Sequence, residues 1–232
     1  MRTGPRSAVH WWNVYADTEQ WERQGATATT LLRWMTDYLS RPHPELGRPG
    51  PVCPFVRQSA EKGLVWAGSA VGGDALTAQR IQDIFDDSFE VYRDLLRESP
   101  ADARRLTLIT VFPELTRYEL IDAVHQERKT EVVREGLMLG QFYPGCTVPG
   151  LWNRDFHPLD APVPMLVLRA MMSTDFPFLV ARTEWLYAYL TQSAPDLPRK
   201  LRWAIAERMQ VDGPEAGQIT ELRIHSADEH AR

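Results

Sequence analysis

One histidine in this sequence combines a versatile side chain with an apolar setting. His125 follows Ile121 by four residues and Val124 by one, so a helix would place it on or beside its apolar face. A neutral imidazole nitrogen in an apolar wall binds metal well and can also exchange protons. His125 is therefore a candidate axial ligand or acid–base group. The alternative is a core histidine that hydrogen-bonds to a neighbouring acceptor.

The two cysteines both stand in rigid sequence. Cys53 lies within Pro51–Phe55, where flanking prolines hold the backbone extended and could present a thiol at a fixed angle. Thiolate is a soft ligand for iron or copper. Cys146 follows Pro144–Gly145 in a second loop. Each cysteine could instead be a small buried hydrophobic residue, and a disulfide between them stays open although two cysteines favour a reducing compartment.

Arg169 interrupts an apolar run that predicts a strand. A guanidinium that enters such a run needs an acceptor, because it cannot lose its charge. The sequence offers an internal salt bridge with Asp175 or Asp160, or a grip on the acid group of a substrate or cofactor. Asp86 and Asp87, by contrast, are expected on the solvated flank of a helix.

Several functions are disfavoured by what the sequence lacks. It has no glycine-rich dinucleotide or phosphate loop, and no metalloprotease, paired-cysteine or serine-hydrolase motif. The net charge is −5 and no basic block stands out, so we expect no nucleic-acid partner. No apolar run is long enough to span a bilayer, so we expect a soluble, cytoplasmic protein without membrane contact.

Apolar periodicity predicts four strands and four helical regions. A Thr116–Glu119 capping box is expected to start the third helix, and Gly136 to end it. The predicted strands are 63–70, 106–112, 137–143 and 163–170. The predicted helices are 27–39, 77–97, 119–135 and a C-terminal region from 185 to 209 that breaks near Pro195.

This order predicts an α+β fold. We expect a mixed or antiparallel sheet of about four strands with helices mainly on one face, in a ferredoxin-like, split-βαβ variant. Residues 1–48 would form an N-terminal arm and helix, 49–211 a single domain, and 212–232 a flexible tail. The tryptophans of the arm could pack on the domain or on a second copy, which makes a homodimer plausible.

The segment Gly136–Leu179 is predicted to shape a pocket. Two strands bracket a loop rich in glycine, proline and aromatic residues, and such a loop is costly to order. It would form one wall, which carries Cys146, Trp152 and Arg169. The helix of His125 and the Cys53–Phe55 loop would form the other.

Two family resemblances add to this interpretation. The segments GLMLGQFYPGC and PVPMLVLRAMMSTDFPFL resemble the bacterial domain family DUF6875, found near natural-product genes, over about Pro49–Leu190. The CPF at Cys53–Phe55 and the helix that carries His125 resemble the YqcI/YcgG family of haem-dependent N-oxygenases. That resemblance implies a haem b cofactor with His125 as proximal iron ligand. It also implies that Cys53 and Phe55 line the pocket, and that Arg169 binds a haem propionate or the substrate carboxylate.

These observations lead to three hypotheses of function. The first is a haem-dependent tailoring enzyme of specialised metabolism that oxygenates a nitrogen of an amino-acid-like substrate. The second is a non-haem protein that uses the same pocket to bind or modify a small-molecule or carrier-bound ligand. The third is an accessory interaction protein without catalysis.

Overall fold

A six-stranded mixed sheet forms the centre of the molecule in the computed structural model, which describes residues 1–210. The order across the sheet is β1-β2-β3-β4-β6-β5. The predicted tail, 212–232, lies outside the described residues. All four predicted strands are present, but the expectation of about four was wrong, because two N-terminal strands join them. The strands are β1 (Arg2–Thr3), β2 (His10–Asn13), β3 (Val65–Ser69), β4 (Thr107–Val111), β5 (Leu137–Phe142) and β6 (Met165–Ala170).

Helices connect and cover the strands. They are α1 (Thr18–Glu22), α2 (Ala26–Arg33), α3 (Val56–Glu61), α4 (Ala78–Glu98), α5 (Glu119–Arg134), α6 (Thr183–Ser193) and α7 (Arg199–Met209). A π-helical segment, Trp34–Leu39, continues α2, and a 3-10 segment, η5 (Ser173–Phe178), follows β6. No described helix is long and apolar enough to cross a membrane.

The N-terminal arm is part of the core. Trp11 of β2 pairs with Gly68 of β3 and is fully buried. A Cβ atom at Gly68 would lie 2.7 Å from the Trp11 ring, so only glycine accommodates the indole there. The indole Nε1 donates to the Thr110 hydroxyl of β4 at 2.9 Å. Packing of the arm on the domain was one of the two expected alternatives, but strands β1 and β2 escaped prediction because they are too short to show an alternating pattern.

From β3 to β6, the strands and long helices follow a β-α-β-α-β-β order along the chain. Helix α4 links β3 to the parallel strand β4, and α5 links β4 to β5. Strand β6 then lies between β4 and β5, antiparallel to both. A ferredoxin-like domain runs β-α-β-β-α-β, so this finer prediction is not confirmed.

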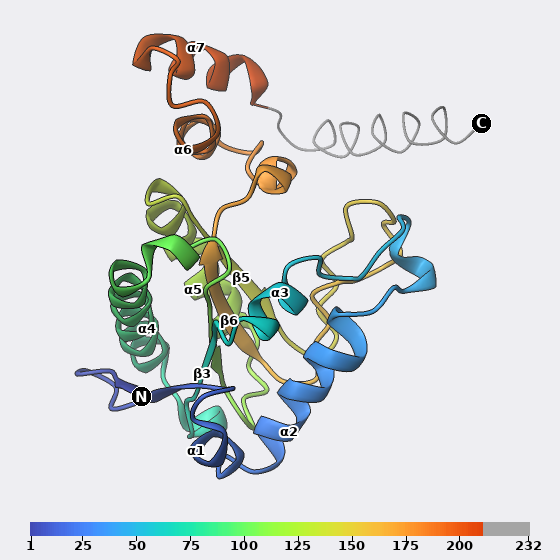
Figure 1. Cartoon of the computed structure of the whole chain (residues 1–232), viewed down its shortest axis with the longest axis vertical. Helices are drawn as coiled ribbons and strands as arrows, with labels where there is room; N and C mark the ends of the chain where they lie inside the picture. The colour runs from blue at the N-terminus through green and yellow to red at the C-terminus, as the bar shows by residue number, and fades with distance from the viewer. Residues whose placement is uncertain (211–232) are drawn as a thin grey trace.

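Helices cover both faces of the sheet, which corrects the expectation that they lie mainly on one. On one face, α4 and α5 pack against side chains such as Leu108 and Leu168. On the other, α1, α2 and the π-helical segment pack against Ile109, Val111 and Met165. Figure 1 shows α4 and α5 on one side of the strands and α2 on the opposite side. Because neighbouring strand residues point to opposite faces, each strand contributes to both cores.

Helix α5 begins in an unexpected way. The predicted capping box is absent: no side chain caps the helix, whose N-cap residue is Tyr118. The Thr116 hydroxyl and amide instead donate to the carboxylate of Asp74, at 2.6 and 2.7 Å. The Arg117 amide also donates to Asp74 at 3.3 Å. A carboxylate from the loop after β3 therefore anchors the chain that enters α5. The helix ends before Gly136 (φ +75°), as predicted.

Candidate functional site

Arg169 is held by an internal carboxylate, one of the two alternatives that the sequence left open. Its two terminal nitrogens donate to the two oxygens of Asp175 at 2.7 and 2.6 Å. Asp175 is 2 % exposed and also accepts from the Met172 amide at 2.7 Å. Burial opposes the charge of Arg169, but the bonds with Asp175 raise the pKa of the guanidinium above its ordinary value. This bidentate pair locks β6 onto η5.

The structure places Cys53 and Phe55 beside Arg169. The guanidinium carbon lies 5.8 Å from the centre of the Phe55 ring, a cation–π contact. The Cys53 thiol is half-buried and interacts electrostatically with Arg169. Three of the six predicted site residues therefore meet at the end of β6.

His125 faces the edge of the sheet. Its Nε2 lies 3.1 Å from the carbonyl oxygen of Leu139. A carbonyl can only accept, so Nε2 carries the hydrogen and has no lone pair for a metal. Because β5 is the last strand of the sheet, its carbonyls that point away from β6 have no strand partner. The imidazole of His125 hydrogen-bonds to one of them. Burial, together with the charge of Lys129, lowers the pKa of His125 to about 4.

Cys146 and Trp152 lie in two other places. Cys146 is buried and contacts Tyr143, whose hydroxyl donates to Asp122 at 2.8 Å. Burial, then these two partners, raises the pKa of Tyr143. The backbone of Trp152 lies against Gly47. This contact joins the loop that contains Cys53 to the loop that contains Cys146. Cys53 and Cys146 are both free thiols.

These placements do not fit a haem held by His125. The Nε2 atom is occupied, and no described contact joins His125 to Cys53, Phe55 or Arg169. Two hollows on the described part of the chain, one beside α6 and α7 and one beside the N-terminal arm, are lined by none of the six predicted residues. Within residues 1–210 no group of three or more histidine, cysteine, aspartate or glutamate side chains could hold a metal ion. The residues predicted to bind haem do not form one site, so haem-dependent oxygenation stays a prediction.

The hollow beside the N-terminal arm lies where β3 ends. It has a volume of about 250 Å³ and is bounded by the N-terminal arm, the end of β3 and the first turns of α4. We call it the arm hollow. Its lining is Ser7, Ala8, Val9, His10, Trp12, Gln24, Ser69, Ala70, Val71, Arg80 and Ile84.

Arg80 supplies the charge of the arm hollow. Its terminal nitrogens donate to the carbonyl oxygens of Arg6 and Ser7, at 3.0 and 2.5 Å. No carboxylate lies within ion-pair distance of it among the described residues. A guanidinium has five N–H donors, so donors remain after these two bonds. The hollow therefore contains a fixed positive charge without a negative partner.

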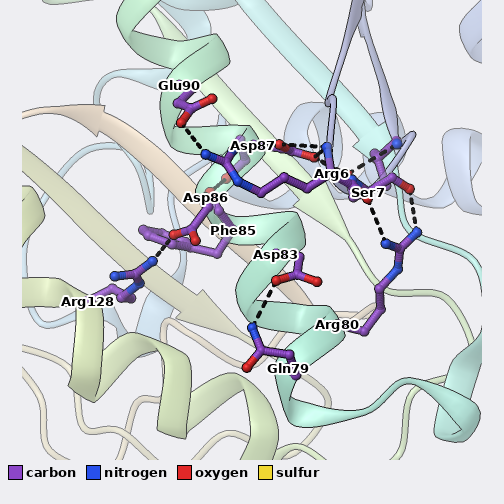
Figure 2. A network of polar contacts seen from close by, with 12 residues as sticks. Arg6, Ser7, Gln79, Arg80, Asp83, Phe85, Asp86, Asp87, Glu90 and Arg128 are labelled. Carbon is purple, nitrogen blue, oxygen red and sulfur yellow. Dashed lines mark hydrogen bonds and ion pairs between the residues drawn. The ribbon is translucent and has the colours of Figure 1, made fainter.

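A buried aspartate fixes the wall of the arm hollow (Figure 2). Asp87 of α4 is fully buried, so the expectation that it lies on a solvated flank was wrong. It accepts from the amide and hydroxyl of Ser7 at 2.6 Å each, and from the amide and side chain of Arg6 at 3.0 and 2.9 Å. Burial favours the neutral carboxyl, but the bonds from Ser7 and Arg6 outweigh it and lower the pKa of Asp87. The burial of Asp87 could have been predicted from helical periodicity, because Asp87 follows the buried Ile84 by three residues and lies on the same helix face.

The turn held by Asp87 is strained. Ala8 has a φ of +58°, a left-handed conformation that a residue with a Cβ atom rarely adopts. Its amide donates to the Gly4 carbonyl at 2.9 Å, which closes the turn. Strain of this kind persists where surrounding contacts enforce it, and it concentrates at ligand-binding sites. Ala8 lies on the rim of the arm hollow.

Comparison with known proteins gives a family but no activity. Residues 28–204 match the family described as "Domain of unknown function (DUF6875)". Neither curated proteins nor solved structures yield a match to the chain. The matched segment contains His125 and the group formed by Cys53, Phe55 and Arg169. The N-terminal arm, which lines the arm hollow, precedes the matched segment.

Proposed function

The chain belongs to the DUF6875 family, and we propose that it is a ligand-binding or tailoring protein whose arm hollow binds a small organic acid. The observation that carries the proposal is Arg80, a positive charge without a carboxylate partner on the wall of a hollow of about 250 Å³. This is the second of the three functions that the sequence led us to expect, moved to a different site.

The size of the hollow limits the ligand. Pockets for drug-sized molecules usually measure about 300–1,000 Å³. The arm hollow is smaller, so its ligand has about the size of an amino acid. Trp12 and Val71 offer apolar surface for the body of the ligand, and Ser69 and Gln24 offer polar groups for orientation.

The charge of the hollow selects an acid. Carboxylates bind guanidinium groups through paired, charge-assisted hydrogen bonds. Arg80 is already fixed by two carbonyl oxygens, so its remaining donors lose little freedom when a ligand binds. The α4 helix also begins here, capped by the Thr77 hydroxyl, and its N-terminal dipole adds to the positive potential.

Thermal unfolding with matched ligand pairs tests the proposal. Benzoate, phenylacetate and L-phenylalanine should raise the unfolding midpoint of the full chain, whereas benzamide and phenylacetamide should not. Arg80→Gln should weaken binding of the acids at least about tenfold, since a hydrogen bond to a charged group contributes about 1.5–3 kcal/mol. Equal shifts with acids and amides would contradict the proposal.

Two control pairs separate binding from folding. Arg57→Gln also removes an exposed arginine that holds a carbonyl, that of Ser40, and it should leave binding intact. Val71 is 78 % exposed, so Val71→Asp should fold normally yet repel the acid. Val148→Asp is the matched control, because it introduces the same charge at an exposed valine outside the arm hollow and should leave acid binding intact. Acid binding that persists in both Arg80→Gln and Val71→Asp would refute the arm hollow as the site.

An optical titration with haem tests the first hypothesis in the same samples. A Soret band that needs His125 would revive haem chemistry and show that Nε2 can leave Leu139. A colourless protein that still binds the acids would support the proposed function.

A further inference from the structure

Lys129 lies between α5 and α6 without a carboxylate partner. Its ammonium nitrogen sits 4.6 Å from the ring centre of Trp185 and 3.5 Å from the carbonyl oxygen of Phe178, a long contact. No ion pair to it occurs within residues 1–210. The side chain is half-buried, so the charge is neither fully hydrated nor neutralised.

The carboxylate that attracts Lys129 is already engaged. Asp175 attracts Lys129, but both its oxygens bind Arg169 and one also binds the Met172 amide. Arg182, which precedes α6, lies on the same Trp185 ring at 5.1 Å and repels the ammonium group. The Trp185 ring and the Phe178 carbonyl favour the charged ammonium group, whereas burial and Arg182 favour the neutral amine.

The titration of Lys129 agrees with this geometry. Burial, only partly offset by Asp175 and reinforced by Arg182, lowers the pKa of Lys129 to about 8. The other titratable neighbour is His125, one turn earlier on α5, which is neutral at pH 7. At pH 7.5 such a lysine is neutral in roughly a quarter of the molecules, compared with about a thousandth for an ordinary lysine.

We propose that Lys129 is a nucleophilic lysine that forms an imine with a small 2-oxo acid or similar anionic carbonyl compound. Arg182, which is exposed and lies over the same ring as Lys129, would take the carboxylate. The amine nitrogen adds to the carbonyl carbon, both amine hydrogens leave with the carbonyl oxygen as water, and C=N replaces C=O. The step involves no oxidation or reduction.

The chain provides its own reference residues for a test. It contains three lysines, and the other two, Lys62 and Lys200, are exposed. Full-length protein is incubated with glyoxylate and cyanoborohydride at pH 7.5. The hydride converts each imine to a stable secondary amine, and peptide mapping then measures the labelling rate of each lysine.

Lys129 should react at least about tenfold faster than either reference lysine, with a pH midpoint near 8. Acetaldehyde, which has no carboxylate, should lose most of this selectivity. Arg182→Gln should lower glyoxylate labelling of Lys129 but not acetaldehyde labelling, whereas Arg23→Gln, at an exposed helical ion pair, should change neither.

Equal labelling of the three lysines, or slower labelling of Lys129, would overturn the proposal. The wild-type protein carries this test, so no variant has to fold for it to be decisive. The site lies on α5 and α6, away from Arg80, so its failure and the failure of the arm hollow are distinguishable.

Discussion

Asp87→Asn is the most direct test of how the N-terminal arm is held. The carboxylate accepts from four donors, the amide and hydroxyl of Ser7 and the amide and guanidinium of Arg6. Asparagine keeps one acceptor oxygen and turns an NH₂ group toward the remaining donors. The NH₂ group would then face the Arg6 guanidinium, a donor that Oδ1 accepts in the wild-type protein.

The expected cost follows from burial. Ser7 is 4 % exposed and Asp87 fully buried, so the Ser7 donors cannot turn to water. An unsatisfied buried polar group costs about 1–3 kcal/mol. Both Ser7 donors bind Oδ2, which asparagine can replace with its one oxygen, so the cost comes from the lost charge in these bonds and from the NH₂ group that replaces Oδ1. We expect Asp87→Asn to lower the free energy of unfolding by about 1–3 kcal/mol.

Urea unfolding and amide hydrogen exchange together measure this effect. A loss of that size lowers the midpoint of thermal unfolding by roughly 2–12 °C in a chain of this length. The Val9 amide, which donates to the Ser7 hydroxyl at 3.2 Å, should also lose protection. Because the pKa of Asp87 is lowered in the fold, its contribution is present above the ordinary carboxyl pKa and is lost as pH falls through the lower folded value.

Asp86→Asn is the matched control. It makes the same chemical change at the neighbouring position, where the side chain is 33 % exposed and pairs with Arg128. We expect it to cost less than about 1 kcal/mol. If Asp87→Asn unfolds within about 0.5 kcal/mol of wild type with unchanged exchange in the arm, the buried carboxylate does not anchor it.

Three further substitutions probe other contacts. The fold lowers the pKa of His125, so its contribution to the free energy of unfolding is complete above pH 6.5 and falls by up to about 3 kcal/mol toward pH 4. In His125→Gln, urea unfolding should show a smaller dependence of stability on pH over this range. Arg169→Met leaves Asp175 buried without its partner and should cost about 3–5 kcal/mol by denaturant titration, and a loss below 1 would refute the buried pair. Gly136→Ala puts a residue with a Cβ atom at a φ of +75°, and calorimetry should show a loss of more than about 1 kcal/mol even if the flexible end of the Gln192 side chain moves aside. A neutral effect would mean that the backbone at this position relaxes without cost.

Much of the local structure could be predicted from sequence. The apolar runs of β3, β4, β5 and β6 and the stripe of α4 reflect contacts between near neighbours and the period of each element. Gly136 predicted the end of α5 because few other residues tolerate its φ of +75°. The need of Arg169 for a carboxylate was also predictable, since a guanidinium cannot neutralise itself.

The candidate site could not be predicted in the same way. Cys53, Phe55 and Arg169 do meet, but His125 turns to a carbonyl of the edge strand, and strand order decides which carbonyls are unpaired. Local patterns cannot encode that order, because it arises from pairings between distant segments.

Long-range partners decided the rest. Asp74 replaces the expected capping box from 42 residues away, and Asp87 holds Ser7 across 80 residues. The sequence by itself determined α2, α4, α5, the C-terminal helical region, most of the strands and the family, because these depend on spacing along the chain. It did not predict the short helices α1 and α3. Only the tertiary structure decided which charges are neutralised, and among residues 1–210 it left Arg80 and Lys129 without carboxylates. Charge pairing depends on proximity in space, which spacing along the chain does not reveal.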